Sequence, residues 1–192
     1  RALQYSTVSN NTAVGALAGS ATTTGAENTF IGANAGAANT SGRFNTFVGE
    51  ITGDANTTGA RNAAFGQQAF STNTTGDFNT AVGRGSLYNN TTADSNTAVG
   101  YESLYNNTTG TNNTAVGHSC LDSATTASNN TAVGKDALED ASTGAENTAV
   151  GVSSLKSNTT GAANTAIGEG SAKDITTGSQ NVMIGADTGR AA

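Results

Sequence analysis

The stretch Asn113-Thr114-Ala115-Val116-Gly117 recurs, unchanged or slightly varied, along the whole of this 192-residue chain. Eleven copies follow one another at intervals of 17 residues without insertion or deletion. The copies begin at Asn11, Asn28, Asn45, Asn62, Asn79, Asn96, Asn113, Asn130, Asn147, Asn164 and Asn181. Because self-similarity at a fixed period is the sequence signature of repeat architectures, the repeat decides the fold. We number each copy from this asparagine as position 1, which puts an invariant glycine at position 5.

The composition of the repeat predicts strands and turns. Position 2 is Thr in nine copies, position 4 is always Val, Ile or Phe, and position 9 is Leu in five consecutive copies. Helical repeats need about 33 residues for a helix pair, and Thr, Val and Gly are poor helix formers. We therefore expect an all-β fold, a parallel β-solenoid of about eleven 17-residue coils, each with a strand, a turn, a second strand and a turn. Coils stacked ~4.8 Å apart would form a single domain, residues 1–192, roughly 50 Å long.

The period-two alternation of a strand suggests which positions face inward. We expect Val or Ile at position 4 and Thr at position 2 to fill the coil, with Leu at position 9 opposing them. Position 3, which is Ala in eight copies, would then face outward and lie against a second copy of the chain. Glycines at positions 5 and 15 are expected at turns with positive φ. Stacked asparagines at position 1 are expected to form an amide ladder.

Charge placement gives a second indication of geometry. The chain has 8 basic and 14 acidic side chains, and all of them except Arg1 fall at positions 6, 7, 10, 11, 16 or 17. We expect the uncharged positions to be buried, or stacked too tightly to tolerate like charges above one another.

Composition also excludes several classes of protein. One cysteine cannot form a disulfide framework within a chain, and a net charge of -6 argues against binding nucleic acid through its phosphates. No apolar run approaches the ~18 residues of a membrane span, so we expect no membrane insertion. Val, Ile, Leu and Phe make up only about 15% of the chain, below the ~20% at which a conventional core becomes doubtful. Such a small core predicts self-association.

The repeat resembles the Asn-Ser-Val-Ala-Ile-Gly repeat of YadA-like head domains in trimeric autotransporter adhesins, and similar repeats of bacteriophage tail-fibre proteins. Aligned on the glycine, position 4 matches the inward Ile of that family, position 3 its Ala and position 2 its inward Val. The resemblance runs from about Ser9 to Gly189. It implies a left-handed parallel β-roll in a tight homotrimer. The period of 17 is longer than the coils usual in that family, and Thr replaces Val at position 2.

Residues capable of chemistry are few and scattered. His118, the only histidine, stands at position 6 among charged residues and is expected on the surface. Cys120 at position 8 replaces Ala or Ser and is expected to be a buried, inert thiol. Asp136, Glu139 and Asp140 form the densest acidic group and the best place for a surface Ca²⁺ ion, although no calcium-binding repeat is present. We therefore predict no catalytic residues, no cofactor and no metal.

Aromatic residues form the one candidate binding patch. Tyr88, Tyr101 and Tyr105 occupy positions 10, 6 and 10 in adjacent coils, and all of these positions carry charge elsewhere in the chain. Exposed aromatic side chains can stack on sugars or anchor a protein partner. The alternative is that this cluster packs against a neighbouring subunit.

Three functional classes remain. The first is a non-enzymatic fibre segment, either of a bacterial surface adhesin or of a phage tail fibre, that attaches to a host glycan or surface protein and is therefore extracellular. The second is an ice-binding solenoid, against which the Thr pairs at positions 13 and 14 argue, because adjacent residues cannot both face outward. The third, an enzyme, lacks acid, base and metal candidates. Neither end shows a capping sequence, so we expect a segment of a longer protein or end-to-end stacking into a filament.

Overall fold

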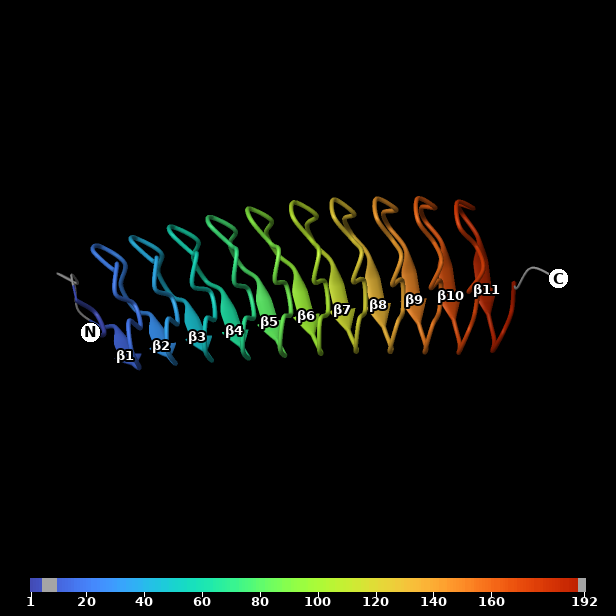
Figure 1. The fold of residues 1–192 in the computed structure, drawn as a ribbon. Helices are drawn as coiled ribbons and strands as arrows, with labels where there is room; N and C mark the ends of the chain where they lie inside the picture. Colours follow the sequence, from blue (N-terminus) through green and yellow to red (C-terminus); the bar gives the residue numbers. More distant parts are fainter. Residues whose placement is uncertain (5–9, 190–192) are drawn as a thin grey trace.

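A computed structural model of the chain describes residues 1–4 and 10–189. Its regular structure consists of eleven three-residue strands, one for each repeat (Figure 1). They are β1 (Thr12–Val14), β2 (Thr29–Ile31), β3 (Thr46–Val48), β4 (Ala63–Phe65), β5 (Thr80–Val82), β6 (Thr97–Val99), β7 (Thr114–Val116), β8 (Thr131–Val133), β9 (Thr148–Val150), β10 (Thr165–Ile167) and β11 (Val182–Ile184). In the described part of the chain no helix is long and apolar enough to cross a membrane.

The strands form one parallel sheet in sequence order, from β1 to β11. Each residue pairs with the equivalent residue of the next repeat, as Thr114 does with Thr131 and Ala115 with Ala132. The predicted parallel β-solenoid is therefore confirmed, and Figure 1 shows its coils stacked into an elongated rod.

Each described coil contains one strand, and the prediction of a second strand around position 9 is wrong. Positions 7 and 9 adopt positive φ in most coils, as in Glu102 (φ 51°) and Leu104 (φ 51°). A left-handed residue interrupts an extended segment. The chain therefore crosses the far side of the coil in turns, although their backbone amides still bond from coil to coil, as Leu104 N does to Cys120 O at 2.9 Å.

The inward and outward faces of the strand are the reverse of our prediction. Position 3 is fully buried in β2 to β10, from Phe30 through Ala98 to Ala166, whereas positions 2 and 4 are half-buried or exposed. The ladder of small residues at position 3 thus lines the interior and cannot contact a second copy. Positions 2, 4 and 14 carry no charge although they are not buried, so burial does not explain them and the other expectation, close stacking of equivalent residues, stays a prediction for them.

The interior has room for one large side chain at each level, which explains why Ala is inside. Phe30 at position 3 lies opposite Gly36 at position 9, where an added Cβ would lie 2.5 Å from the ring. Phe47 and Gly53 repeat this arrangement in the next coil, with a corresponding distance of 2.6 Å. In six of the eight coils with Ala at position 3, position 9 is instead large, as in Phe70 or Leu104, and is fully buried as predicted; Gly19 and Ala172 are the exceptions. Positions 3 and 9 thus face each other with complementary volumes.

Two ladders of buried amides supplement this thin core. At position 1, Asn130 donates its backbone amide to Asn113 Oδ1 at 3.0 Å and its Nδ2 to Gly144 O at 3.0 Å, which confirms the predicted asparagine ladder. A second ladder at position 12 was not predicted. In it, Asn90 Nδ2 donates to Asn73 Oδ1 at 3.0 Å. Because these amides, apart from the Oδ1 atoms of Asn107 and Asn158, are satisfied by one another and by the backbone, polar side chains can fill the interior.

The two glycine positions serve different purposes. Every glycine at position 5 has a φ between 125° and 148°, as predicted. At Gly100 (φ 141°) an added Cβ would also overlap the carbonyl oxygen of Gly117. Position 15 does not have positive φ, which corrects the prediction; its glycines leave space for the backbone of the next coil. Ala93 and Ala127 occupy this position in two coils.

Candidate interaction surface

The outward side of the sheet is a continuous, uncharged stripe that nothing in the described chain covers. Position 4 side chains expose 36–41% of their surface on six of the interior strands. These are Ile31, Phe65, Val82, Val116, Val133 and Ile167. Threonine at position 2 flanks position 4 in nine of eleven strands, and positions 1 to 5 carry no charge in any repeat. We call the outward side chains at positions 2 and 4 the strand face. Exposed apolar stripes of this length are typical of interaction sites, so the strand face is the candidate surface.

The edge that precedes each strand, at positions 16 and 17, carries charged and aromatic side chains, and we call it the upstream rim. Arg61 lies between two phenylalanine rings, with its guanidinium carbon 5.4 Å from the centre of Phe44 and 5.2 Å from that of Phe78. Arg43 contacts the same Phe44 ring and pairs with Glu27 at 3.6 Å. These contacts hold the cations at the surface beside the strand face.

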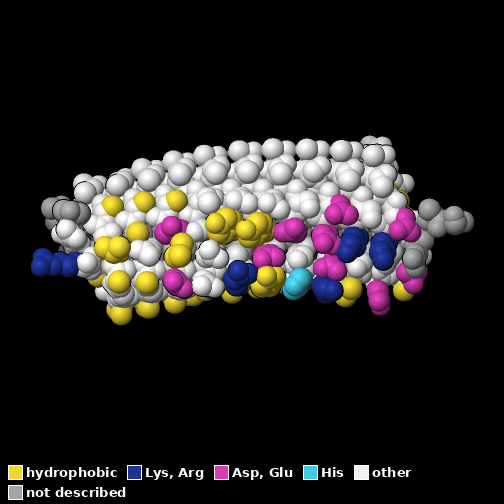
Figure 2. Space-filling view, viewed as in Figure 1, with side chains coloured by type: hydrophobic (Ala, Val, Ile, Leu, Met, Phe, Trp, Pro, Cys, Tyr) yellow, Lys and Arg dark blue, Asp and Glu magenta, His cyan; other side chains and the backbone are white. Residues whose placement is uncertain are grey.

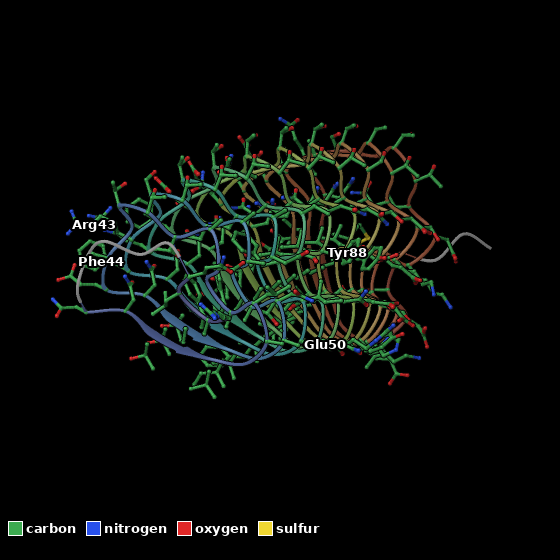
Figure 3. All side chains as sticks on the ribbon, turned by 60° about the vertical axis from the view of Figure 1, so that its left-hand side comes forward. Arg43, Phe44, Glu50 and Tyr88 are labelled. Atoms are coloured by element: carbon green, nitrogen blue, oxygen red, sulfur yellow. The ribbon has the colours of Figure 1, made fainter. Side chains whose placement is uncertain are left out.

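The opposite edge is position 6, directly after the corner glycine, and we call it the downstream rim. Gln67 Nε2 donates to Glu50 Oε2 at 2.9 Å, and Arg84 Nη1 donates to the Tyr101 hydroxyl oxygen at 3.0 Å. Tyr101 in turn stacks on His118 with their ring centres 5.1 Å apart. Figure 3 labels both rims beside β3: Arg43 and Phe44 lie before the strand and Glu50 lies after it, well apart.

Of the three tyrosines of the predicted patch, Tyr101 lies on the downstream rim, and Tyr88 and Tyr105 lie on the flank next to it. Tyr88 and Tyr105 stack with ring centres 5.0 Å apart and an interplanar angle of 7°. An added Cβ at Gly85 would lie 3.3 Å from the Tyr105 ring, so this ring extends over the glycine. Because the stacked rings cover one another, one face of each ring is closed to a ligand. Whether this cluster binds a partner stays a prediction.

The acidic group predicted as the best Ca²⁺ position contains lysines as well. Lys156 Nζ lies 2.6 Å from Glu139 Oε2 and 3.7 Å from Asp136 Oδ2, and Lys135 Nζ lies 3.4 Å from the same Asp136 oxygen. Ammonium groups thus stand where a cation would have to bind. Within residues 1–4 and 10–189 no group of three or more His, Cys, Asp or Glu side chains could hold a metal ion.

Charge in this region gathers on one flank of the rod. Figure 2 shows acidic and basic side chains in rows over the middle and C-terminal coils, and hydrophobic side chains toward the N-terminal coils. Asp122 lies near Glu102, Glu139 and Asp140, and half-burial together with these like charges raises its pKa to about 6. His118 is exposed, as predicted, with Nδ1 3.9 Å from Asp136 Oδ1.

The only cysteine is placed as predicted. Cys120 is fully buried, and its thiol donates to Ala132 O at 3.2 Å. Burial raises its pKa to about 12. The thiol is therefore protonated at neutral pH and unsuited to nucleophilic chemistry.

A polar groove runs along the coils between positions 11 and 13. It encloses about 550 Å³ and is lined by Thr72, Asn89, Thr91, Asn106, Thr108, Ser123 and Thr125. All of these side chains are neutral hydroxyls or amides. The threonine hydroxyls already donate to backbone carbonyls of the next coil, as Thr108 Oγ1 does to Thr125 O at 2.9 Å, so these hydroxyl oxygens can only accept hydrogen bonds from a ligand. Sequence reasoning missed this groove. Its signal is the run of four uncharged polar residues at position 11, from Thr72 to Ser123, which follows three coils with Ala at that position.

Comparison with known proteins identifies no relative. No protein-family model, no curated protein and no solved structure matches the chain. The function therefore has to be inferred from the strand face, the two rims and the flank that carries the tyrosines.

Proposed function

We propose that this chain is a non-enzymatic structural segment of an extracellular fibre, in which copies of the chain pack side by side through the strand face. One observation carries the proposal: an uncharged stripe of Val, Ile, Phe and Thr runs along all eleven strands and is open to solvent in the single chain. Water-exposed apolar surface is favourably buried by association. From the sequence, position 3 is expected to contact the second copy. We now assign this contact to positions 2 and 4, which face outward.

The size of the strand face is sufficient for a stable contact. Eleven strands at ~4.8 Å, each three residues of ~3.3 Å, give a face of about 500 Å². Two such faces together reach the ~1,000 Å² that a specific interface needs, before the rims are counted. The interior of each coil, by contrast, holds mostly alanine, one large side chain per level and buried asparagine.

The number of copies and the location follow from the resemblance of the repeat. YadA-like heads and phage tail-fibre repeats suggest three copies, left-handed coils and a place on a bacterial surface or a virion. A shaft or receptor-binding segment of a tail fibre is the alternative within this class. Attachment to a host glycan is the proposed role of Tyr88, Tyr101 and Tyr105. Unchanged binding to a glycan array after replacing all three with Ser would contradict that role.

The mass of the native protein in solution tests the proposal. Light scattering is expected to give a multiple of the chain mass, which is three times the chain mass for a trimer. Small-angle scattering is expected to show a rod of the same length as a single chain. Val82→Asp combined with Val116→Asp should dissociate the assembly, because each copy would bury carboxylates in the contact. Thr92→Asp combined with Thr109→Asp, at the exposed position 14, is the matched control and should leave the mass unchanged. Far-UV circular dichroism must show that both variants remain folded.

Ice binding is the second candidate, and the reversed strand face supports it. Thr at position 2 and Val at position 4 stand on alternate residues, about 6.7 Å apart along the strand and ~4.8 Å apart between strands. Such a regular, uncharged array could order water. The argument from positions 13 and 14 is not general, because Thr23 and Thr24 are both exposed; in the interior coils position 14 is exposed and Thr74 at position 13 is half-buried and donates to Thr91 O at 3.0 Å. A monomer with thermal hysteresis would support ice binding and contradict the fibre.

A further inference from the structure

The charges of the two rims follow a pattern along the rod. At β3, Arg43 on the upstream rim stands across the strand from Glu50 on the downstream rim. At β5 the signs are exchanged, with Asp77 upstream and Arg84 downstream. No strand carries the same charge on both rims.

The charges on three downstream-rim residues are also opposite in sign to the charges on the upstream rim of the next strand. Arg61 at β4 comes one level after Glu50, and Asp94 at β6 one level after Arg84. Glu146 at β9 likewise comes one level after Lys135 at β8. If each downstream-rim residue instead met the upstream rim of the preceding strand, like charges would come together. Arg84 would then meet Arg61, and Glu50 would meet Glu27.

These pairs cannot form within one chain. Positions 17 and 6 are separated by the strand and its corners, about five residues or ~16 Å. They can meet only between copies. Where two strand faces pack with both rods pointing in the same direction, the upstream rim of one copy lies beside the downstream rim of the other at the same level.

We propose that copies of this chain associate in parallel and in register, with Glu50, Arg84 and Lys135 of one copy pairing with upstream-rim charges of the next. Their partners are Arg43 and Arg61 for Glu50, Asp77 and Asp94 for Arg84, and Glu146 for Lys135. The proposal rests on the proposed function, since it assigns the partner of the strand face. It adds the direction and register of that partner.

The side chains are free enough to make these contacts. Those of Arg43, Arg84 and Lys135 are 54%, 49% and 60% exposed. Their contacts within the chain, such as Arg84 to Glu102 at 3.3 Å, are surface pairs of small energy that can be exchanged. Asp77 and Asp94 each use Oδ1 to accept a backbone amide of the preceding coil at 2.7 Å, which fixes their carboxylates at the rim.

An antiparallel contact fits this charge pattern poorly. If one of two facing copies is reversed, the upstream rim of one copy lies against the upstream rim of the other. Because β6 is the central strand of eleven, β6 of one copy then lies opposite β6 of the other. Asp94, which precedes β6, would then face its own copy. Charge complementarity of this kind determines register and orientation more than affinity.

Disulfide trapping tests the direction of the copies, and their register to within one level, because Lys135 and Glu146 lie on adjacent levels. In full-length chain with Cys120→Ser, the pair Lys135→Cys and Glu146→Cys should cross-link neighbouring copies under mild oxidation, giving covalent multimers in denaturing gels. The matched control, Lys135→Cys with Gln180→Cys, places the second thiol two strands further along the upstream rim. It should not cross-link, because about 10 Å of additional offset exceeds disulfide reach.

Charge exchange provides the second measurement. Lys135→Glu and Glu146→Lys alone should each raise the dissociation midpoint in sedimentation about threefold, and the double variant should return it to within about twofold of the native value. An assembly that remains oligomeric but gives no 135–146 cross-link, or in which the double variant adds the two defects, overturns the register proposal alone. A native monomer overturns the proposed function itself.

Discussion

Asn107 donates its Nδ2 to Asn90 Oδ1 at 2.9 Å, yet its own Oδ1 accepts no hydrogen bond. The reason lies one coil further on, where position 12 is Ala124 and no amide follows. The ladder resumes only at Asn158, after a second alanine at Ala141. The interior thus contains a two-coil gap in an otherwise repeated chain of amides.

Closing this gap should stabilise the protein. Ala124→Asn alone moves the unsatisfied oxygen one coil along and should change the free energy of unfolding little. Adding Ala141→Asn connects Asn107 to Asn158 and removes one buried unsatisfied acceptor, for a gain of about 1 kcal/mol. Urea denaturation of the native chain, the single variant and the double variant measures the difference. Equal free energies of unfolding for the double and single variants would show that the gap in the asparagine ladder does not lower stability.

The corner glycine should be intolerant of any side chain. Gly100→Ala requires a positive φ of 141° and a Cβ that overlaps the next coil, so we expect a loss of about 3 kcal/mol in denaturant unfolding. Gly144→Ala is the control, because an added Cβ there also meets the next coil but position 15 has no positive φ and accommodates Ala93 and Ala127. A loss as large for Gly144→Ala would attribute the effect to coil spacing rather than to the backbone conformation.

Asp122 should make stability fall as the pH rises from about 4 to about 6. Its pKa is raised to about 6 from the ordinary value of 3.8, so the folded chain binds the proton more tightly than the unfolded chain in this window. Allowing for solvent screening of a half-exposed group, the loss is roughly 1 kcal/mol. Asp122→Asn should remove this portion of the pH dependence in thermal melts at pH 4 and pH 7. If the native protein and Asp122→Asn lose the same stability between pH 4 and pH 7, the pH dependence arises from other carboxyl groups.

The Cys120 thiol should be unreactive in the folded protein. Its burial and a pKa of about 12 leave almost no thiolate at pH 8, so Ellman's reagent should label it only as rapidly as the coil opens. Labelling should become complete and fast in denaturant. Rapid labelling of the native protein would mean that this coil opens readily in solution.

Much of this fold could be predicted from the 17-residue period, because equivalent residues such as Thr114 and Thr131 can stack only if every coil has the same length. The direction of the strand side chains was predicted wrongly. Thr and Val at positions 2 and 4 are larger than the alanine at position 3, and β-branched residues are usually placed inside. The complementary sizes of Phe30 with Gly36, and of Phe47 with Gly53, held the correct answer.

The candidate site was less accessible to sequence reasoning. Once position 3 was placed outward, the strand face was necessarily missed, since it consists of the residues assigned to the core. Tyr88 and Tyr105 stack on one another, whereas Tyr101 stacks on His118, and this division depends on coil geometry that the sequence does not specify. The opposed rims could be recognised only after the corners at positions 17 and 5 were known.

The backbone hydrogen bonds that hold one coil to the next join residues mostly 16 or 18 apart, and nearly the same set recurs at every 17-residue step, which gives the rod a modular mechanics. Each coil is stabilised by its immediate neighbours, so free energy accumulates coil by coil and tension on the ends would peel the chain in equal increments. Length can therefore vary by whole repeats without redesigning any contact. A deletion of 17 residues shortens the rod by one coil and leaves every ladder in phase, whereas a deletion of 16 leaves one extra residue in the joined coil and breaks the ladders at that junction.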